Sequence, residues 1–470
     1  MIIGKPAPFV RAFVDAVDEA IRAQSPSHGM SAMQRTWLAF CVTAVLVTNS
    51  ICWARFERAS LGTYSLAALS WMFRHSKIPW DDLLVASVRV ILRHYGITSG
   101  SLVIDDTDNQ RSKSAQTLAH LYKLRDKESG GYIWGQSLVF LLLVTPTISI
   151  PVGFAFYQPA PEFSAWYKKA KALKKQGVAK PQRPPKPPAN PAYPTKQQLA
   201  LRLLERFHAH HPTFRVHCIM ADALYGTAPF VDGASVTFGG VQVISQIRSN
   251  QKVRLHKRDQ HVADYFPTHP GTPQKMRIRG GEEVVALVGS ARLYVCSHKT
   301  KRFVVALKYE GEETYRYLIA SDLSWRTLDI VQGQTLRWLV ELLLKEWKSY
   351  ANLHAFDTAK PVIVEGLIWI AIAAAALKRF LAHMTQLLTA VPMSTRKVAM
   401  CAMHVLGDVV EALKSGDEAR LYAALEAAIM YLSCHAQRAH PERDRRTGRS
   451  QLGLEPCFEN DDVIEFAEAA

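Results

Sequence analysis

Two apolar runs that end in acidic residues constrain the fold of this chain more than any other feature. They are SLVIDDTDN, residues 101–109, and FRVHCIMAD, residues 214–222. Strands of this composition are buried on both faces of a sheet. Carboxylates at the ends of such strands lie at the edge of the core, where they can converge on a ligand. A single Asp at such a place more often caps a turn or a following helix.

A third charged feature lies in RWLVELLLKEWK, residues 337–348, which is predicted to be helical. At about 100° per residue, the apolar side chains share one face, namely Leu336, Leu339, Val340, Leu343 and Trp347. The polar face holds Gln334, Arg337, Glu341, Lys345 and Lys348. Such a face is often only solvated, with pairs like Arg337–Glu341 worth about 0.2–0.5 kcal/mol. The apolar face predicts docking on a core.

Together, these acidic residues predict a site for two divalent metal ions. The candidate ligands are Asp105 or Asp106, Asp222 and Glu341. Their hard oxygen atoms suit Mg²⁺ or Mn²⁺. Two such ions, about 3.5–4 Å apart, can activate a water or a 3′-hydroxyl and stabilise the leaving oxygen in phosphodiester displacement. Arg337 and Lys348 would then hold DNA phosphates.

Composition indicates a folded protein with an anionic partner. Hydrophobic residues make up 48% of the 470 residues, and the net charge is +16. That surplus favours nucleic acid or an anionic membrane surface, although an inert basic surface has the same composition. The seven Cys residues are odd in number and form no CxxC pair, which favours reduced thiols and a cytoplasmic location.

Two apolar stretches resemble membrane spans, but neither fits one. The uncharged run 138–156 contains Pro146 and Pro151 and is predicted to form two buried strands joined by a turn. The run 366–377 is too short to cross a bilayer as a helix. The first residues lack the pattern of a signal peptide. We therefore expect no membrane insertion.

The predicted fold class is α/β, with five consecutive parts. Residues 1–95 are predicted to be a helical DNA-binding region, although such helices as commonly only pack together. Residues 96–225 are predicted to be the first part of the core, with a basic, Pro-rich linker at about 165–194. In residues 226–327, strand-like apolar runs alternate with turn residues, and this segment is predicted to form a β-rich insertion. Residues 328–355 hold the helix with Glu341, and 356–470 are predicted to be helical with a charged tail.

These residues resemble the DDE transposases of the IS4 type, which have an RNase H-like catalytic core. In that family, two residues separate a Tyr from an Arg, three more separate the Arg from a Glu, and six more separate the Glu from a Lys. Arg337, Glu341 and Lys348 fit these spacings, and Trp338 matches a frequent Arg-Trp pair. The Tyr position holds Gln334, whose amide can still hydrogen-bond a phosphate.

The resemblance also covers the two Asp positions and extends over about residues 100–350. Asp105 fits the first catalytic position as Asp-any-Thr, and a frame that starts at Asp106 is also used in the family; Asp105 is favoured. Asp222 in MADALYG fits the second position. The long interval from Asp222 to Glu341 fits the β-rich insertion that such transposases place before the last helix.

The resemblance implies cut-and-paste DNA transposition with two Mg²⁺ or Mn²⁺ ions, through hairpin ends. The implied partners are double-stranded DNA, as transposon terminal repeats and target, and a second subunit in the synaptic complex. An aromatic residue, Tyr317 or Trp325, would stack on a flipped base, although the sequence around both also fits a position in the core. The implied DNA-binding residues are Gln334, Arg337, Trp338, Lys345, Lys348 and Tyr317. The alternatives are a metal-dependent nuclease without strand transfer and an inactive DNA-binding relative.

Overall fold

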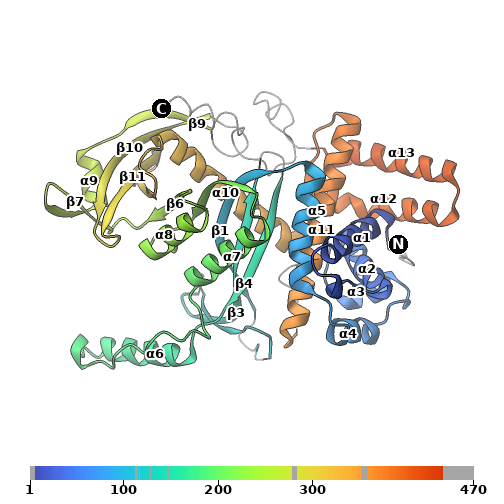
Figure 1. The fold of residues 1–470 in the computed structure, drawn as a ribbon, viewed down its shortest axis with the longest axis horizontal. Helices are drawn as coiled ribbons and strands as arrows, with labels where there is room; N and C mark the ends of the chain where they lie inside the picture. The colour runs from blue at the N-terminus through green and yellow to red at the C-terminus, as the bar shows by residue number, and fades with distance from the viewer. Residues whose placement is uncertain are drawn as a thin grey trace.

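A twelve-stranded mixed sheet runs from the middle of the protein to one end, and helices cover the other end (Figure 1). The structure is a computed structural model that describes residues 6–111, 115, 117–126, 129–145, 148–277, 283–350 and 358–437. The charged tail and Cys457 lie outside these residues. The mixed α/β class predicted from the sequence is confirmed.

Helices form the N-terminal part, as predicted from its apolar spacing. They are α1 (Pro8–Arg22), α2 (Ala32–Thr48), α3 (Trp53–Ala59), α4 (Leu66–His75) and α5 (Trp80–Tyr95). Ser31 caps α2 through a capping box with Gln34, and Gly96 ends α5 in the left-handed conformation that glycine adopts readily. The DNA-binding role of this part stays a prediction.

Five strands form the RNase H-like core of the sheet. They are β1 (Ser99–Gln110), β3 (Tyr132–Val144), β4 (Ser149–Tyr157), β5 (Arg215–Ala221) and β6 (Gln242–Ile247). Their order is β4-β3-β1-β5-β6, in which β3 is antiparallel to β1 and β4 while β1, β5 and β6 are parallel. The uncharged run 138–156 therefore forms parts of β3 and β4, which confirms two buried strands in place of a membrane span.

The remaining strands extend the same sheet. Beyond β6 lie β12 (Arg316–Ala320), β11 (Thr300–Tyr309), β10 (Glu283–Val295), β7 (Lys252–Leu255) and β8 (Arg258–His261). Strand β9 (Thr272–Arg277) pairs with β10, and β2 (Tyr122–Arg125) pairs with β3. The segment 226–327 is thus β-rich, but it also holds α9 (Val262–Thr268), α8 (Ala228–Thr237) and the core strand β6. The division into domains stays a prediction.

The side-chain alternation of the strands divides the core into two layers. On one face, side chains such as Val103 and Phe140 pack with α10 (Thr327–Tyr350) and α11 (Pro361–Thr389). On the other face, side chains such as Ile104 and Val139 pack with α7 (Lys196–His210) and α8. Residues on one strand therefore point to different layers according to whether their numbers are odd or even.

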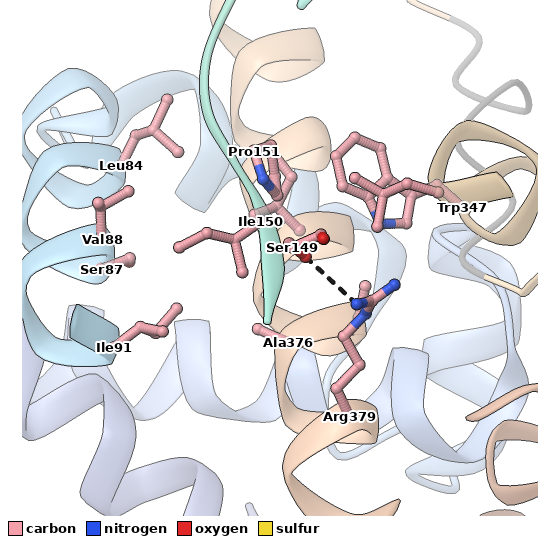
Figure 2. A pocket seen from close by; sticks show the side chains of 13 residues that line it. Leu84, Ser87, Val88, Ile91, Ser149, Ile150, Pro151, Trp347, Ala376 and Arg379 are labelled. Atoms are coloured by element: carbon pink, nitrogen blue, oxygen red, sulfur yellow. Dashed lines mark hydrogen bonds between the residues drawn. The ribbon is translucent and has the colours of Figure 1, made fainter. Parts of the chain in front are cut away.

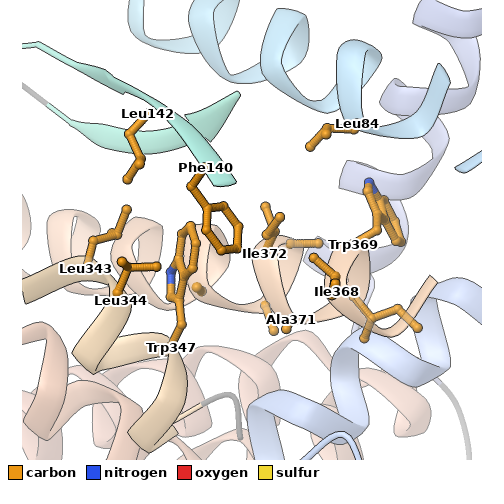
Figure 3. Packing of buried hydrophobic residues seen from close by; sticks show 14 of the residues in the cluster. Leu84, Phe140, Leu142, Leu343, Leu344, Trp347, Ile368, Trp369, Ala371 and Ile372 are labelled. Carbon is orange, nitrogen blue, oxygen red and sulfur yellow. The ribbon is translucent and has the colours of Figure 1, made fainter. Parts of the chain in front are cut away.

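Helix α10 docks on the sheet through the apolar face predicted from the sequence. Leu336, Val340, Leu343 and Trp347 are all buried. The Trp347 ring lies edge-on to Phe140 of β3, with ring centroids 5.5 Å apart, and residues of α11 complete the packing (Figure 3). This layer fixes which face of α10 meets the edge of the sheet.

Helix α11 is longer than its apolar run suggested. The run 366–377 lies inside a 29-residue helix, which by length and composition alone would suffice to cross a membrane. Of its most apolar window, 78% is buried inside the fold, which accounts for its composition. It packs against α2, α4, α5 and α10, and it is followed by α12 (Thr395–Ser415) and α13 (Glu418–His435).

Candidate metal site

The first acidic pair lies within β1 and not at its end. The parallel pairing of β1 with β5 stops at Ile104 opposite Ala221, whereas the antiparallel pairing with β3 continues to Gln110. The expectation that the strand ends at these acids is therefore wrong, because β3 holds the chain extended beyond them. Asp105 and Asp106 nevertheless sit at an edge, since β5 ends beside them.

The third acid comes from the adjacent strand end, as predicted. Asp222 directly follows β5, and its Oδ1 accepts a hydrogen bond of 2.9 Å from the backbone N–H of Leu224. One carboxylate oxygen from each of Asp105, Asp106 and Asp222 lies within 4.8 Å of the others. Folding therefore brings together acids that are more than 100 positions apart in the chain.

Helix α10 brings Glu341 to the same edge through Arg337. Arg337 Nη1 lies 3.0 Å from Asp105 Oδ2, and Nη2 of the same guanidinium lies 3.1 Å from Glu341 Oε1. One planar group thus joins the strand acid to the helix acid. The polar face of α10 points at the sheet edge here and is not merely solvated.

The two neighbouring Asp residues of β1 face different helices. Asp105 lies two positions after Val103, so its side chain points to the same face of the sheet, and it meets Arg337 of α10. Asp106 lies two positions after Ile104, so its side chain points to the opposite face, and its Oδ2 pairs with the ammonium of Lys196 at the start of α7. Because Glu341 lies on α10, Asp105 is the acid of the pair on the side of Glu341.

Burial makes Asp105 and Asp222 hard to ionise without a cation. Burial raises the pKa of Asp105 to about 6, even though the Arg337 guanidinium and the backbone N–H of Asp106 act in the opposite direction. Burial also raises the pKa of Asp222, and the negative charge of Asp106 adds to the shift. The edge of the sheet therefore carries negative charge that a bound cation would stabilise.

The other polar residues of α10 differ in their surroundings. Lys348 donates to Thr107 Oγ1 at 2.7 Å and to the carbonyl of Asp108 at 3.2 Å, so it ties α10 to β1. Burial lowers its pKa. Lys345 is exposed, and Gln334 is 9% exposed, with an Oε1 that finds no hydrogen-bond donor within the described parts of the chain. The side chain of Trp338 lies outside the described residues.

Tyr317, the expected base-stacking residue, is buried in this structure. Tyr317 is 6% exposed and lies in the layer of α7 and α8, with its ring 6.0 Å from that of Phe266. By strand alternation it faces away from α10. In this structure its ring is therefore packed in the core, and its role in base stacking stays a prediction. Trp325, the second option, is half-buried against the α10 layer.

Sequence reasoning missed two residues beside the acids. Lys196, which pairs with Asp106, is the first residue of α7 after its cap Thr195. Tyr225 is buried, and its hydroxyl has no partner in the described structure. Burial raises its pKa, and the charges of Asp106, Asp222 and Asp105 raise it further. Only the position of Tyr225 in MADALYG, three residues after Asp222, could have drawn attention to it.

The residues fit a divalent metal ion by their donor chemistry. Three clustered carboxylates with a fourth nearby offer hard oxygen atoms, which Mg²⁺ and Mn²⁺ prefer. The unfavourable ionisation of Asp105 and Asp222 is the electrostatic condition that a cation relieves.

A pocket elsewhere in the fold does not compete with this site. It lies between α5, β4, α10 and α11, and most of its lining is apolar (Figure 2). Arg379 Nη1 donates to the carbonyl of Ser149 at its rim, at 3.2 Å. It is lined by no carboxylate, so it lacks the chemistry of a metal site.

An RNase H-like sheet with acids clustered where β5 ends beside β1 defines a class of metal-dependent enzymes that cleave nucleic acids. Comparison with protein families gives the same result, since residues 33–293 match the DDE superfamily endonuclease family. The chain belongs to this family. The matched region includes Asp105, Asp106 and Asp222 and ends before α10, so it does not assign Glu341. A search of curated proteins finds no match.

Proposed function

We propose that the protein is a DNA transposase that uses Asp105, Asp222 and Glu341 as ligands of two Mg²⁺ or Mn²⁺ ions. The observation that carries the proposal is the Arg337 bridge, which holds the acid of α10 beside the acid of β1. Membership of the DDE superfamily endonucleases supports divalent-metal dependence and a nucleic acid substrate. Bound ions of this kind supply the activation of a water or 3′-hydroxyl and the stabilisation of the leaving oxygen.

The residues around the acids have separate proposed roles. Asp105 is favoured over Asp106 as ligand because it faces α10, whereas Asp106 is held by Lys196. Arg337, once a metal ion neutralises the acids, is free to hold a DNA phosphate, and exposed Lys345 is placed to do the same. Lys348 positions α10 against β1 through Thr107.

The proposed reaction is cut-and-paste transposition, as the likeness of Arg337, Glu341 and Lys348 to the IS4 pattern implies. Strand cleavage at a transposon end would free a 3′-hydroxyl, which attacks the opposite strand to give a hairpin and, after reopening, attacks target DNA. Two ends must be held together for this, so the active form would be at least a dimer. The net charge of +16 supports a DNA partner.

Strand transfer distinguishes a transposase from a simple endonuclease. The test incubates the purified protein and Mn²⁺ with a donor plasmid that carries the DNA flanking its own gene, together with a supercoiled target. Joined products and hairpin ends are expected from the wild type, and neither from Glu341→Gln or Asp222→Asn. The exposed variant Asp259→Asn should retain activity. Cleavage without joining would favour an endonuclease, and cleavage by Glu341→Gln would contradict the proposed metal site.

A further inference from the structure

A basic arm projects from the fold between β4 and α7. The arm comprises residues 161–195, with α6 (Pro161–Lys175), a short 3₁₀ turn (Lys180–Gln182) and a Pro-rich return segment. It extends away from the rest of the fold at the lower left of Figure 1. None of the residues of α6 is buried, so the arm contributes little to the core.

The arm is folded on itself. Phe163 and Trp166 lie on one face of α6 with ring centroids 5.3 Å apart, and Trp166 Nε1 donates to the carbonyl of Pro184 at 2.8 Å. Asn190 near the end of the return segment donates to Glu162 at 2.7 Å. A flexible solubilising linker needs no such contacts. The contacts give the arm a definite shape, and they leave the lysines of α6 exposed.

The arm concentrates positive charge. It holds eight Lys or Arg residues and one acid, Glu162, so it supplies seven of the sixteen net positive charges of the chain. Five lysines of α6 are exposed and make no ion pair within the described residues: Lys168, Lys169, Lys171, Lys174 and Lys175. Like charges three or four positions apart on a helix repel each other. A polyanion lying along the helix would relieve this repulsion.

The arm ends beside the acidic cluster, and its helix contacts the adjacent strand β3. It returns to the fold at Thr195, which caps α7, and the next residue is the Lys196 that pairs with Asp106. Along α6, Lys171 reaches Tyr132, the first residue of β3, with its Nζ 3.4 Å from the hydroxyl. The start of β3 pairs with the end of β1, beyond the acids. The arm therefore lies at the same edge of the sheet as the proposed metal site.

We propose that the basic arm binds the phosphate backbone of duplex DNA and holds the duplex beside the acidic cluster. The 15 residues of α6 span about 22 Å at about 1.5 Å per residue, which matches six or seven base-pair steps of about 3.4 Å. The contacts are to phosphate and carry no base preference, because lysine ammonium groups act as point charges. This inference rests on the proposed function for the identity of the polyanion.

The test compares two full-length variants with the same change in net charge. In one, the five α6 lysines become Gln. In the control, five exposed lysines of the β-rich part become Gln: Lys252, Lys257, Lys275, Lys299 and Lys301. Binding to a 40-base-pair duplex of random sequence is measured in EDTA from 50 to 200 mM salt. Near-ultraviolet circular dichroism checks that both variants remain folded.

The arm variant is expected to bind at least tenfold more weakly than the control at 100 mM salt. Its slope of log affinity against log salt should fall by about 0.9 for each phosphate that the variant no longer neutralises. Equal reductions of affinity in both variants would overturn the inference. So would an arm variant that binds DNA normally but no longer binds vesicles of phosphatidylcholine with phosphatidylserine, which would assign the arm to a membrane surface. The proposed function fails separately, if the wild type shows no Mn²⁺-dependent cleavage.

Discussion

Arg337 Nη1 lies 3.0 Å from Asp105 Oδ2, although 232 positions separate the two residues in the chain. The same guanidinium contacts Glu341, so it fills the space between two of the three proposed metal ligands. A metal ion that binds both acids must take over the role of this group. The relationship links the stability of this edge of the sheet to the cation that it is proposed to bind.

Replacing Arg337 with Gln should lower the stability of the metal-free protein and increase the stabilisation that Mn²⁺ gives. Without the guanidinium, a buried carboxylate loses a charged partner, which costs about 1–3 kcal/mol. Mn²⁺ should then raise the free energy of unfolding more in the variant than in the wild type, because it no longer displaces the guanidinium. Urea unfolding in EDTA and in Mn²⁺ measures both effects.

The matched control for this variant is Arg316→Gln. Arg316 also pairs with a Glu four positions away, but its side chain is 53% exposed, and it begins β12, which β6 separates from β5. Its free energy of unfolding should change by less than about 0.5 kcal/mol, with or without Mn²⁺. Equal Mn²⁺ effects in the wild type and in Arg337→Gln would contradict the idea that the guanidinium and the metal share one place.

The raised pKa of Asp105 predicts how the stability of the metal-free protein depends on pH. Its folded pKa of about 6 lies above the unfolded value of about 3.9. The folded state therefore binds the proton more tightly, and this contribution is present below pH 4 and is lost as pH rises through 6. Relative to Asp105→Asn, the free energy of unfolding of the wild type should fall by up to about 2–3 kcal/mol between pH 4 and pH 7. Urea unfolding in EDTA across this range tests it, and parallel pH profiles would contradict it.

Lys348 and Lys345 should behave differently when each is replaced with Met. Lys348 holds Thr107 and the carbonyl of Asp108, so its loss should cost about 1–2 kcal/mol of stability. Lys345 is exposed, and its loss should change the free energy of unfolding by less than about 0.5 kcal/mol while weakening DNA binding. Chemical unfolding and duplex binding are measured on both proteins. A destabilised Lys345→Met with an unaffected Lys348→Met would contradict the assignment.

Trp347 anchors α10 to the sheet, so its removal should affect the metal site indirectly. Trp347→Ala is expected to cost about 3–5 kcal/mol and to weaken Mn²⁺ binding, because Glu341 lies on the same helix. Trp347→Phe should cost less than about 1.5 kcal/mol, since it also removes a buried indole N–H that has no partner in the described structure. Calorimetric unfolding and Mn²⁺ titration give both quantities. Normal Mn²⁺ binding by a folded Trp347→Ala would show that α10 does not position a ligand.

The sequence predicted the convergence of the acids because strand ends and helix faces follow simple periodicities. The apolar run before Asp222 and the helical spacing of Leu336, Val340 and Leu343 were enough to define β5 and the docking face of α10. The family match confirms the DDE endonuclease class. The IS4 assignment and the individual site roles stay predictions.

Other features depend on pairing between distant segments, which local patterns do not record. The extension of β1 past Asp105 requires β3 as a partner, and the ion pair of Lys196 with Asp106 requires α7 to begin beside β1. The burial of Tyr317 in the layer of α7 and α8 was not foreseen, because a strand pattern does not say which helices each face of the sheet meets. The apolar run 366–377 is shorter than α11 because the buried part of the helix continues through charged residues such as Lys378 and Arg379. A search for uncharged residues therefore stops too early.

The central claim is that Asp105, Asp222 and Glu341 bind the same metal ions, and calorimetric titration with Mn²⁺ at pH 7.5 tests it most directly. We expect the wild type to bind Mn²⁺ and Asp105→Asn, Asp222→Asn and Glu341→Gln each to bind at least tenfold more weakly, with exposed Asp259→Asn unchanged. If a folded Glu341→Gln bound Mn²⁺ as tightly as the wild type, α10 would supply no ligand and the proposed site would be wrong.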